Sequence, residues 1–170
     1  MSGSQEIRTQ IASIQNTQKI TKAMEMVAAS KMKKAQDQMI KARPYAEKIS
    51  NVISHLAHAH PEYTSEFFAT REVKKKGYII ISSDRGLCGG LNNNLFKLVV
   101  ETIEEDNKSD IKPAFSLIGS KATSFFQRMG GDVMAQTAQL GDKPQIEQVL
   151  GLIKSTIDSF ISGEIDEVYL

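Results

Sequence analysis

The segment before Pro44 has a composition that fits one long helix and little else. Its only glycine is Gly3, and most of its residues are strong helix formers, above all Ala, Met, Gln, Lys and Glu. Apolar residues recur mostly in steps of three and four, which is the spacing of one buried stripe on a helix. The predicted stripe comprises Ile7, Ile11, Ile14, Ile20, Met24, Val27, Met32, Ala35 and Met39.

The helical pattern extends past Pro44. Proline lacks the N–H that a helix interior needs, so we expect a kink or a brief interruption there. The helical spacing then resumes at Tyr45 and continues to Leu56, which predicts a helix over residues 1–60 and a connector over residues 61–76. Some 55 helical residues would reach roughly 80 Å, whereas a compact chain of this size is about 30–40 Å across. The helix should therefore project from the rest of the chain.

Small side chains interrupt the bulky ones in the middle of this helix. They would let a second helix approach closely, and the larger apolar residues would supply the burial. A sustained heptad of Leu and Ile, typical of a parallel zipper, does not occur. We expect an antiparallel or mixed coiled coil with a partner helix that this chain does not contain. The small residues are Ala12, Ser13, Thr17, Thr21, Ala23, Ala28, Ala29 and Ser30.

The charge distribution separates the helix from the remainder. Residues 1–58 carry nine basic and four acidic residues, a net charge of +5, and the remainder carries −4. The basic segment 31–43 lacks interleaved aromatic residues and any recognisable binding module, which argues against nucleic acid as a partner. A membrane-surface helix would present Trp, Phe or Leu, whereas this one presents Ala and Met. An ordinary solvated helix packed on its own domain remains the alternative to a coiled coil.

The single cysteine excludes a disulfide framework and a Cys-rich zinc module, and it suits a reducing compartment. The N-terminal residues lack the apolar stretch of a signal peptide, and no run of 18 apolar residues occurs. We therefore expect a soluble, intracellular protein.

From Gly77 onward the chain alternates between strand and helix patterns. Strands are predicted over residues 77–84, 113–119, 133–137 and 164–170, and helices over 92–106, 120–131 and 144–161. Ser120 is expected to cap the second helix, and Pro144 to lie in the first turn of the third. This order predicts the α/β class, with a foot domain over residues 77–170 built on a small, Rossmann-like, mostly parallel sheet. Because the last strand runs to Leu170, we expect a C-terminally truncated fragment.

The loop SSDRGLCGGLNNN follows the first of these strands, where open α/β sheets usually bind ligands. A phosphate-binding loop would need GxGxxG or GxxxxGK[ST], and the glycines here match neither pattern. A second interpretation is a nucleophile elbow, since Gly86-Leu87-Cys88-Gly89-Gly90 would place a thiol on a strand-turn-helix junction. Its base would have to be His55, His58 or His60, all of which precede the loop. A cysteine-dependent α/β hydrolase fragment is therefore the alternative function.

The structural interpretation of the same loop needs no ligand. Its glycines would form a tight turn, Asp84 would pair with Arg85, Asn92 would cap the next helix, and Cys88 would pack as a small apolar residue. This interpretation is the one that the residues favour.

Two further clusters carry no predicted chemistry. His55, His58 and His60 have only Glu62 as a nearby acidic ligand, so they fit groups that complement a helix C-terminus better than a metal site. The acidic run 104–106 fits a solvated helix end. We predict no catalytic, cofactor-binding or metal-binding residues.

Two segments resemble one known family. IRTQIASIQNTQKITKAMEMVAASKMKKAQ resembles the N-terminal helix of the gamma subunit of F-type ATP synthase, and SSDRGLCGGLNNN resembles that family's characteristic loop. RPYAEKI and IGSKATSFF agree as well, so the similarity covers essentially all 170 residues and is bacterial in character.

The resemblance implies a rotor. In that family the N-terminal helix pairs with a C-terminal helix as an antiparallel coiled-coil shaft within a hexamer of alpha and beta subunits. The foot contacts the epsilon subunit and the membrane ring of c subunits. Nucleotide chemistry occurs on the beta subunits, so this chain would be noncatalytic, bind no nucleotide, and couple proton flow to ATP synthesis by rotation. It would be peripheral, on the cytoplasmic face of the bacterial inner membrane.

The resemblance also assigns residues. The shaft motif covers Gln15 to Lys31, and Lys19, Lys22, Met24 and Lys31 are expected near acidic lever loops of the beta subunits. The family is longer than this chain, so the chain alone is expected to self-associate through its stripe or to fray. The coiled-coil stripe is Ile7, Ile11, Ile14, Ile20 and Val27. The foot-domain loop comprises Asp84, Arg85, Gly86, Cys88, Gly89, Gly90 and Asn92.

Overall fold

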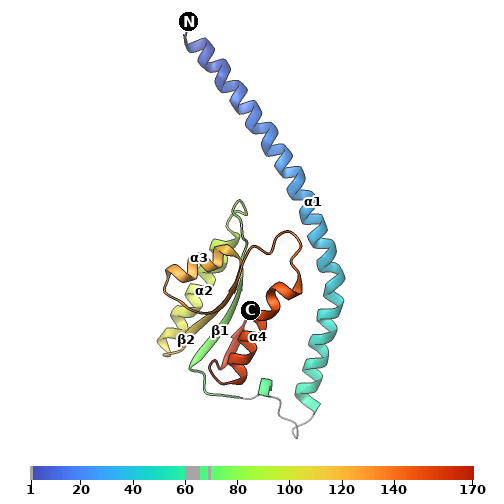
Figure 1. Ribbon diagram of the computed structural model, residues 1–170, viewed down its shortest axis with the longest axis vertical. Coiled ribbons are helices and arrows are strands. Elements are labelled where there is room, and N and C mark those ends of the chain that lie inside the picture. The colour runs from blue at the N-terminus through green and yellow to red at the C-terminus, as the bar shows by residue number, and fades with distance from the viewer. Residues whose placement is uncertain (1, 60–65, 69) are drawn as a thin grey trace. The chain divides into compact units, whose positions relative to one another are not determined.

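The computed structural model describes residues 2–59, 66–68 and 70–170 (Figure 1). The chain divides into two compact units, residues 1–62 and residues 63–170, and each is described by itself.

The first unit consists of helix α1, Ser2–Ala59. The helix is unbroken across Pro44, so the expected interruption is wrong. All residues from 40 to 48 are exposed, and water can therefore satisfy the carbonyl that loses its N–H donor to the proline. Its 58 residues make a helix of about 87 Å. Every residue from 3 to 56 is exposed, including all of its large apolar side chains.

The second unit is a four-stranded sheet with helices on both faces. Its strands are all parallel and lie in the order β3-β2-β1-β4, which confirms the α/β class and the parallel sheet. The elements are the short 3₁₀ helix η1 Glu66–Phe68, β1 Lys75–Ile81, α2 Leu91–Lys108, β2 Lys112–Ile118, α3 Ser120–Arg128, β3 Asp132–Thr137, α4 Ile146–Ile161 and β4 Glu167–Tyr169.

An aromatic core fills the sheet face that α2 and α3 cover. Phe115 and Leu117 of β2 are buried there with Phe126 of α3, whose ring centroid lies 4.8 Å from that of Phe115. Phe96 of α2 meets the same Phe126 ring edge-on at 5.6 Å. Burying a side chain of this size stabilises the fold by about 2 kcal/mol, so this layer fixes α2 and α3 on the sheet.

The opposite face carries α4, as Figure 1 shows. Ser116 lies between two core residues of β2 and therefore points the other way. Its hydroxyl lies 2.6 Å from that of Thr156, a buried residue of α4. The alternation of Phe, Ser and Leu along β2 thus assigns one helix layer to each face.

Some predicted boundaries are corrected. α4 begins at Ile146 rather than at Pro144, because the side chain of Gln148 accepts a hydrogen bond from the backbone N–H of Gln145 at 2.8 Å and so closes the first turn there. β4 covers only three residues. In the described part of the chain, no helix is long and apolar enough to cross a bilayer.

Candidate functional site

The loop between β1 and α2 is braced by a buried asparagine. The Asn92 carboxamide oxygen accepts the Ser83 N–H at 3.2 Å, and its nitrogen donates to the Ser83 hydroxyl at 2.8 Å. Asn92 lies inside α2 and only 8% of it is exposed, whereas the N-cap position belongs to Gly90. The prediction that Asn92 caps α2 is therefore wrong: its amide holds the preceding loop instead.

Asp84 connects three loops at the carboxyl edge of the sheet. Its carboxylate accepts hydrogen bonds from the backbone N–H groups of Ser120, Gln139 and Leu140 at 2.9, 3.0 and 3.2 Å. These bonds, that from Gln139 foremost, lower the pKa of the Asp84 carboxyl below its usual range. The predicted pair with Arg85 is wrong, because the carboxylate is already directed at these donors while Arg85 is exposed.

The N-terminus of α3, where a nucleotide-binding fold would hold a phosphate, is closed by the protein itself. The N–H of Ser120 donates to Asp84, that of Lys121 to the Ser83 carbonyl at 3.2 Å, and that of Ala122 to the Ser82 hydroxyl at 2.8 Å. The expected Ser120 cap is thus corrected as well, because the N-cap is Gly119 and the capping carboxylate comes from Asp84.

Cys88 sits in a polar rather than an apolar setting. Its sulfur accepts a hydrogen bond from the Asn92 amide at 3.3 Å and lies 3.8 Å from the Ser83 hydroxyl. The thiol is half-buried, and neither of these partners is a base, so the described residues offer no activation of a nucleophile here. Leu87, at the tip of the loop, is 95% exposed with a φ of 61°.

The histidine cluster gives no metal site among the residues that the structure describes, where no group of three His, Cys, Asp or Glu side chains converges. His55 belongs to α1 and is exposed. The side chain of His58 and all of His60 and Glu62 lie outside the described residues.

Along α1 the apolar residues occupy two sides instead of one. Ile7, Ile11 and Ile14 share a face, because they are four and three residues apart. The step from Ile14 to Ile20 is six residues, and in an unbroken helix it turns the side chain through about 240°. Ile20 therefore begins a second stripe on another side of the helix, whereas Met32, five full turns after Ile14, lies on the first side again. The predicted coiled-coil stripe draws on both sides of α1 and stays a prediction.

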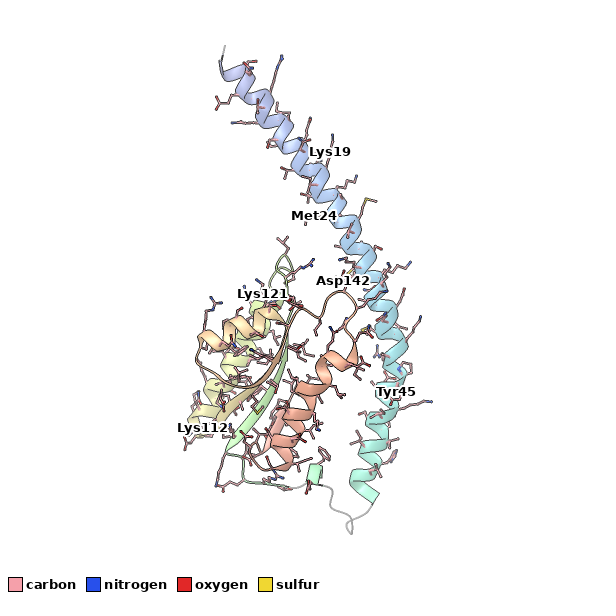
Figure 2. The ribbon with its side chains drawn as sticks, viewed as in Figure 1. Lys19, Met24, Tyr45, Lys112, Lys121 and Asp142 are labelled. Atoms are coloured by element: carbon pink, nitrogen blue, oxygen red, sulfur yellow. The ribbon has the colours of Figure 1, made fainter. Side chains whose placement is uncertain are left out.

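The second stripe carries two of the predicted shaft residues. Ile20, Met24, Val27 and Lys31 follow one another in steps of four, three and four. Lys19 and Lys22 are three residues apart and share a different face of α1. Figure 2 labels Lys19 and Met24 on this helix. Ile20 is 62% exposed and Met24 53% exposed.

Sequence reasoning missed several partners in the second unit. Ser83, Gln139 and Leu140 support the loop, yet nothing in their spacing relates them to Asp84 or Asn92. The nearest signal in the sequence was the glycine of the Gly119-Ser120 pair, because glycine is the usual residue where the backbone needs a positive φ. The structure shows such a φ, 97°, at Gly119 just before α3.

Comparison with known proteins agrees with this architecture. The structure combines a long, exposed helix with a small α/β unit on a parallel sheet. The family model described as ATP synthase matches residues 3–170. ATP synthase gamma chains of Nitrosococcus oceani, Pasteurella multocida and Acinetobacter baylyi are 53%, 54% and 51% identical over all 170 residues. The chain belongs to the ATP synthase gamma-chain family.

The match covers the whole chain but only part of each relative. The chain spans 59% of the length of these curated relatives.

Proposed function

We propose that this protein is the central-stalk subunit of an F-type ATP synthase and couples proton flow to ATP synthesis by rotation. The observation that carries the proposal is the exposure of apolar side chains on two sides of α1, at different levels. Exposure of apolar side chains to water is unfavourable, so each side of the helix is expected to be covered by another protein surface.

A single partner helix covers one stripe, because a coiled-coil seam runs along one side of each helix. In this proposal the face of Ile7, Ile11 and Ile14 and the face of Ile20, Met24 and Val27 contact different surfaces. A shaft that pairs with a second helix inside a surrounding hexamer provides both. This supports an axle over an ordinary solvated helix.

The threonines of α1 are suited to burial in such an assembly. The hydroxyls of Thr9, Thr17 and Thr21 donate to the carbonyls of Gln5, Ser13 and Thr17 at 3.0, 3.0 and 2.9 Å. A hydroxyl already bonded within its own helix can be covered without losing a hydrogen bond to water. Covering these three positions by another protein surface is therefore inexpensive.

The partners follow from the same proposal. The alpha and beta subunits surround the shaft, with Lys19, Lys22, Met24 and Lys31 near acidic lever loops of beta, and the epsilon subunit and the c-subunit ring contact the foot that contains Asp84–Asn92. The subunit is noncatalytic, because nucleotide chemistry belongs to beta. The complex places it peripherally on the cytoplasmic face of the bacterial inner membrane.

Binding of the full chain to a purified hexamer of alpha and beta subunits tests the proposal. We expect Lys22→Glu to weaken binding at least tenfold, since it reverses a charge that faces acidic loops. Lys112→Glu, a reversal at an exposed residue of β2, should bind as the wild type does. Failure of the wild-type chain to bind, or equal loss in both variants, would contradict the proposal.

A further inference from the structure

The edge strand β4 is attached to the sheet by a cluster of four side chains. It pairs with β1 over only three positions, Lys76 with Glu167, Gly77 with Val168 and Tyr78 with Tyr169. So short a ladder specifies its register weakly, because each backbone pair resembles the next. Side chains must therefore help to hold the strand in this register.

Asp106, in the last turn of α2, holds two side chains of β1. Its Oδ1 lies 2.6 Å from the Lys76 ammonium, and its Oδ2 accepts a hydrogen bond from the Tyr78 hydroxyl. Lys76 and Tyr78 are two residues apart on one strand, so they point to the same face of the sheet. The ion pair is largely withdrawn from solvent, with the Lys76 and Asp106 side chains 16% and 11% exposed.

Tyr169 of β4 packs on the side chains that Asp106 holds. Its ring stacks on that of Tyr78 with 5.8 Å between centroids and 24° between planes. The Lys76 ammonium lies 5.4 Å from the centroid of the same ring. A slip of one residue would turn Tyr169 to the opposite face and remove both contacts.

The start of β4 is anchored separately. The Asp166 carboxylate accepts the backbone N–H groups of Lys74 and Lys75 at 2.8 and 2.9 Å. These bonds fix where the chain enters the sheet, but they do not reach the far end of the strand. Tyr169 is the contact that holds that end.

We propose that Asp106 is a positioning residue that holds the far end of β4 in register by keeping Lys76 and Tyr78 under the Tyr169 ring. A buried ion pair gives little net stability, since desolvation offsets its attraction, but it penalises every arrangement that leaves a charge unpaired. The inference concerns the sheet alone and does not depend on the proposed function.

Amide hydrogen exchange of the full chain, read by NMR, tests this inference. We expect Asp106→Asn to speed exchange of the amides that pair β1 with β4 at least tenfold, while the amides between β2 and β3 keep their rates. The contact between the Tyr78 and Tyr169 rings should weaken in the same spectra. Asp110→Asn, at an exposed residue beyond the end of α2, is the matched control and should exchange as the wild type does.

A second set of variants separates positioning from general loss of stability. Tyr169→Leu should reproduce the Asp106→Asn effect, and the double variant should add little to either, whereas Tyr169→Phe should keep the wild-type rates. Lys76→Met provides the same test should Asp106→Asn fail to fold. Equal acceleration of the β1–β4 and β2–β3 amides, or additive effects of the two substitutions, would overturn the inference.

Discussion

Asp84 and Ser120 are joined by two hydrogen bonds to a single oxygen. Oδ1 of Asp84 accepts both the backbone N–H and the hydroxyl of Ser120 at 2.9 Å. A residue that follows β1 thus caps the helix that follows β2. The loops at this edge of the sheet are consequently one hydrogen-bonded assembly rather than separate segments.

Replacing Asp84 by Asn should lower the free energy of unfolding by about 1–3 kcal/mol, because hydrogen bonds to a charged group are stronger than neutral ones. Urea unfolding followed by tyrosine fluorescence measures it, since Tyr78 lies in the core. Asp158→Asn, at an exposed position of α4, should change stability by no more than about 0.5 kcal/mol. An equal loss in both variants would contradict the capping role.

The contribution of Asp84 should disappear in acid. Its pKa is lowered in the fold, chiefly by the N–H of Gln139, whereas in the unfolded chain it is close to 3.9. The stabilisation is therefore present above about pH 4 and is lost as pH falls through the lower, folded-state pKa. The stability gap between wild type and Asp84→Asn should be smaller at pH 3 than at pH 7, and a gap independent of pH would exclude a charged cap.

Gly119→Ala should be among the most damaging single changes in the second unit. A Cβ there would lie 2.2 Å from the Ser82 carbonyl oxygen, and the φ of 97° excludes ordinary side chains. We expect a loss of at least about 3 kcal/mol in urea unfolding. Gly86→Ala, where a Cβ meets nothing within 4 Å, should leave stability unchanged or raise it by up to about 1 kcal/mol.

Asn92→Ala should loosen the loop and expose its thiol. The change removes the partner of the Ser83 N–H and of the Cys88 sulfur, so we expect a loss of about 1–3 kcal/mol and several-fold faster maleimide labelling of Cys88. Asn93→Ala, at the next and exposed residue, should change neither quantity. Wild-type labelling rates in Asn92→Ala would show that the loop is held by other contacts.

The order of the elements could be predicted from the sequence because it depends on local patterns. The helix formers before Pro44 predicted α1, and the alternation of apolar runs with amphipathic segments predicted a parallel sheet. The strand order could not be predicted, since β4 lies beside β1 only through contacts between residues far apart in the chain.

The sequence predicted which segment forms the candidate site, but it did not predict the contacts that the residues of this segment make. The loop 84–92 was identified, whereas the roles of Asp84 and Asn92 were not, because each depends on donors that the fold brings from elsewhere. Asp106 shows the same limit. Its place in an acidic run suggested a solvated helix end, yet the structure pairs it with Lys76, 30 residues earlier.

The six-residue step between Ile14 and Ile20 has a geometric consequence. A helix with a single apolar stripe presents that stripe on the same side along its whole length, so one partner surface can cover it. Because α1 carries apolar side chains on one side at residues 7–14 and on another at residues 20–27, a surface that covers the first group does not cover the second. This difference between the two levels is a property of the single helix.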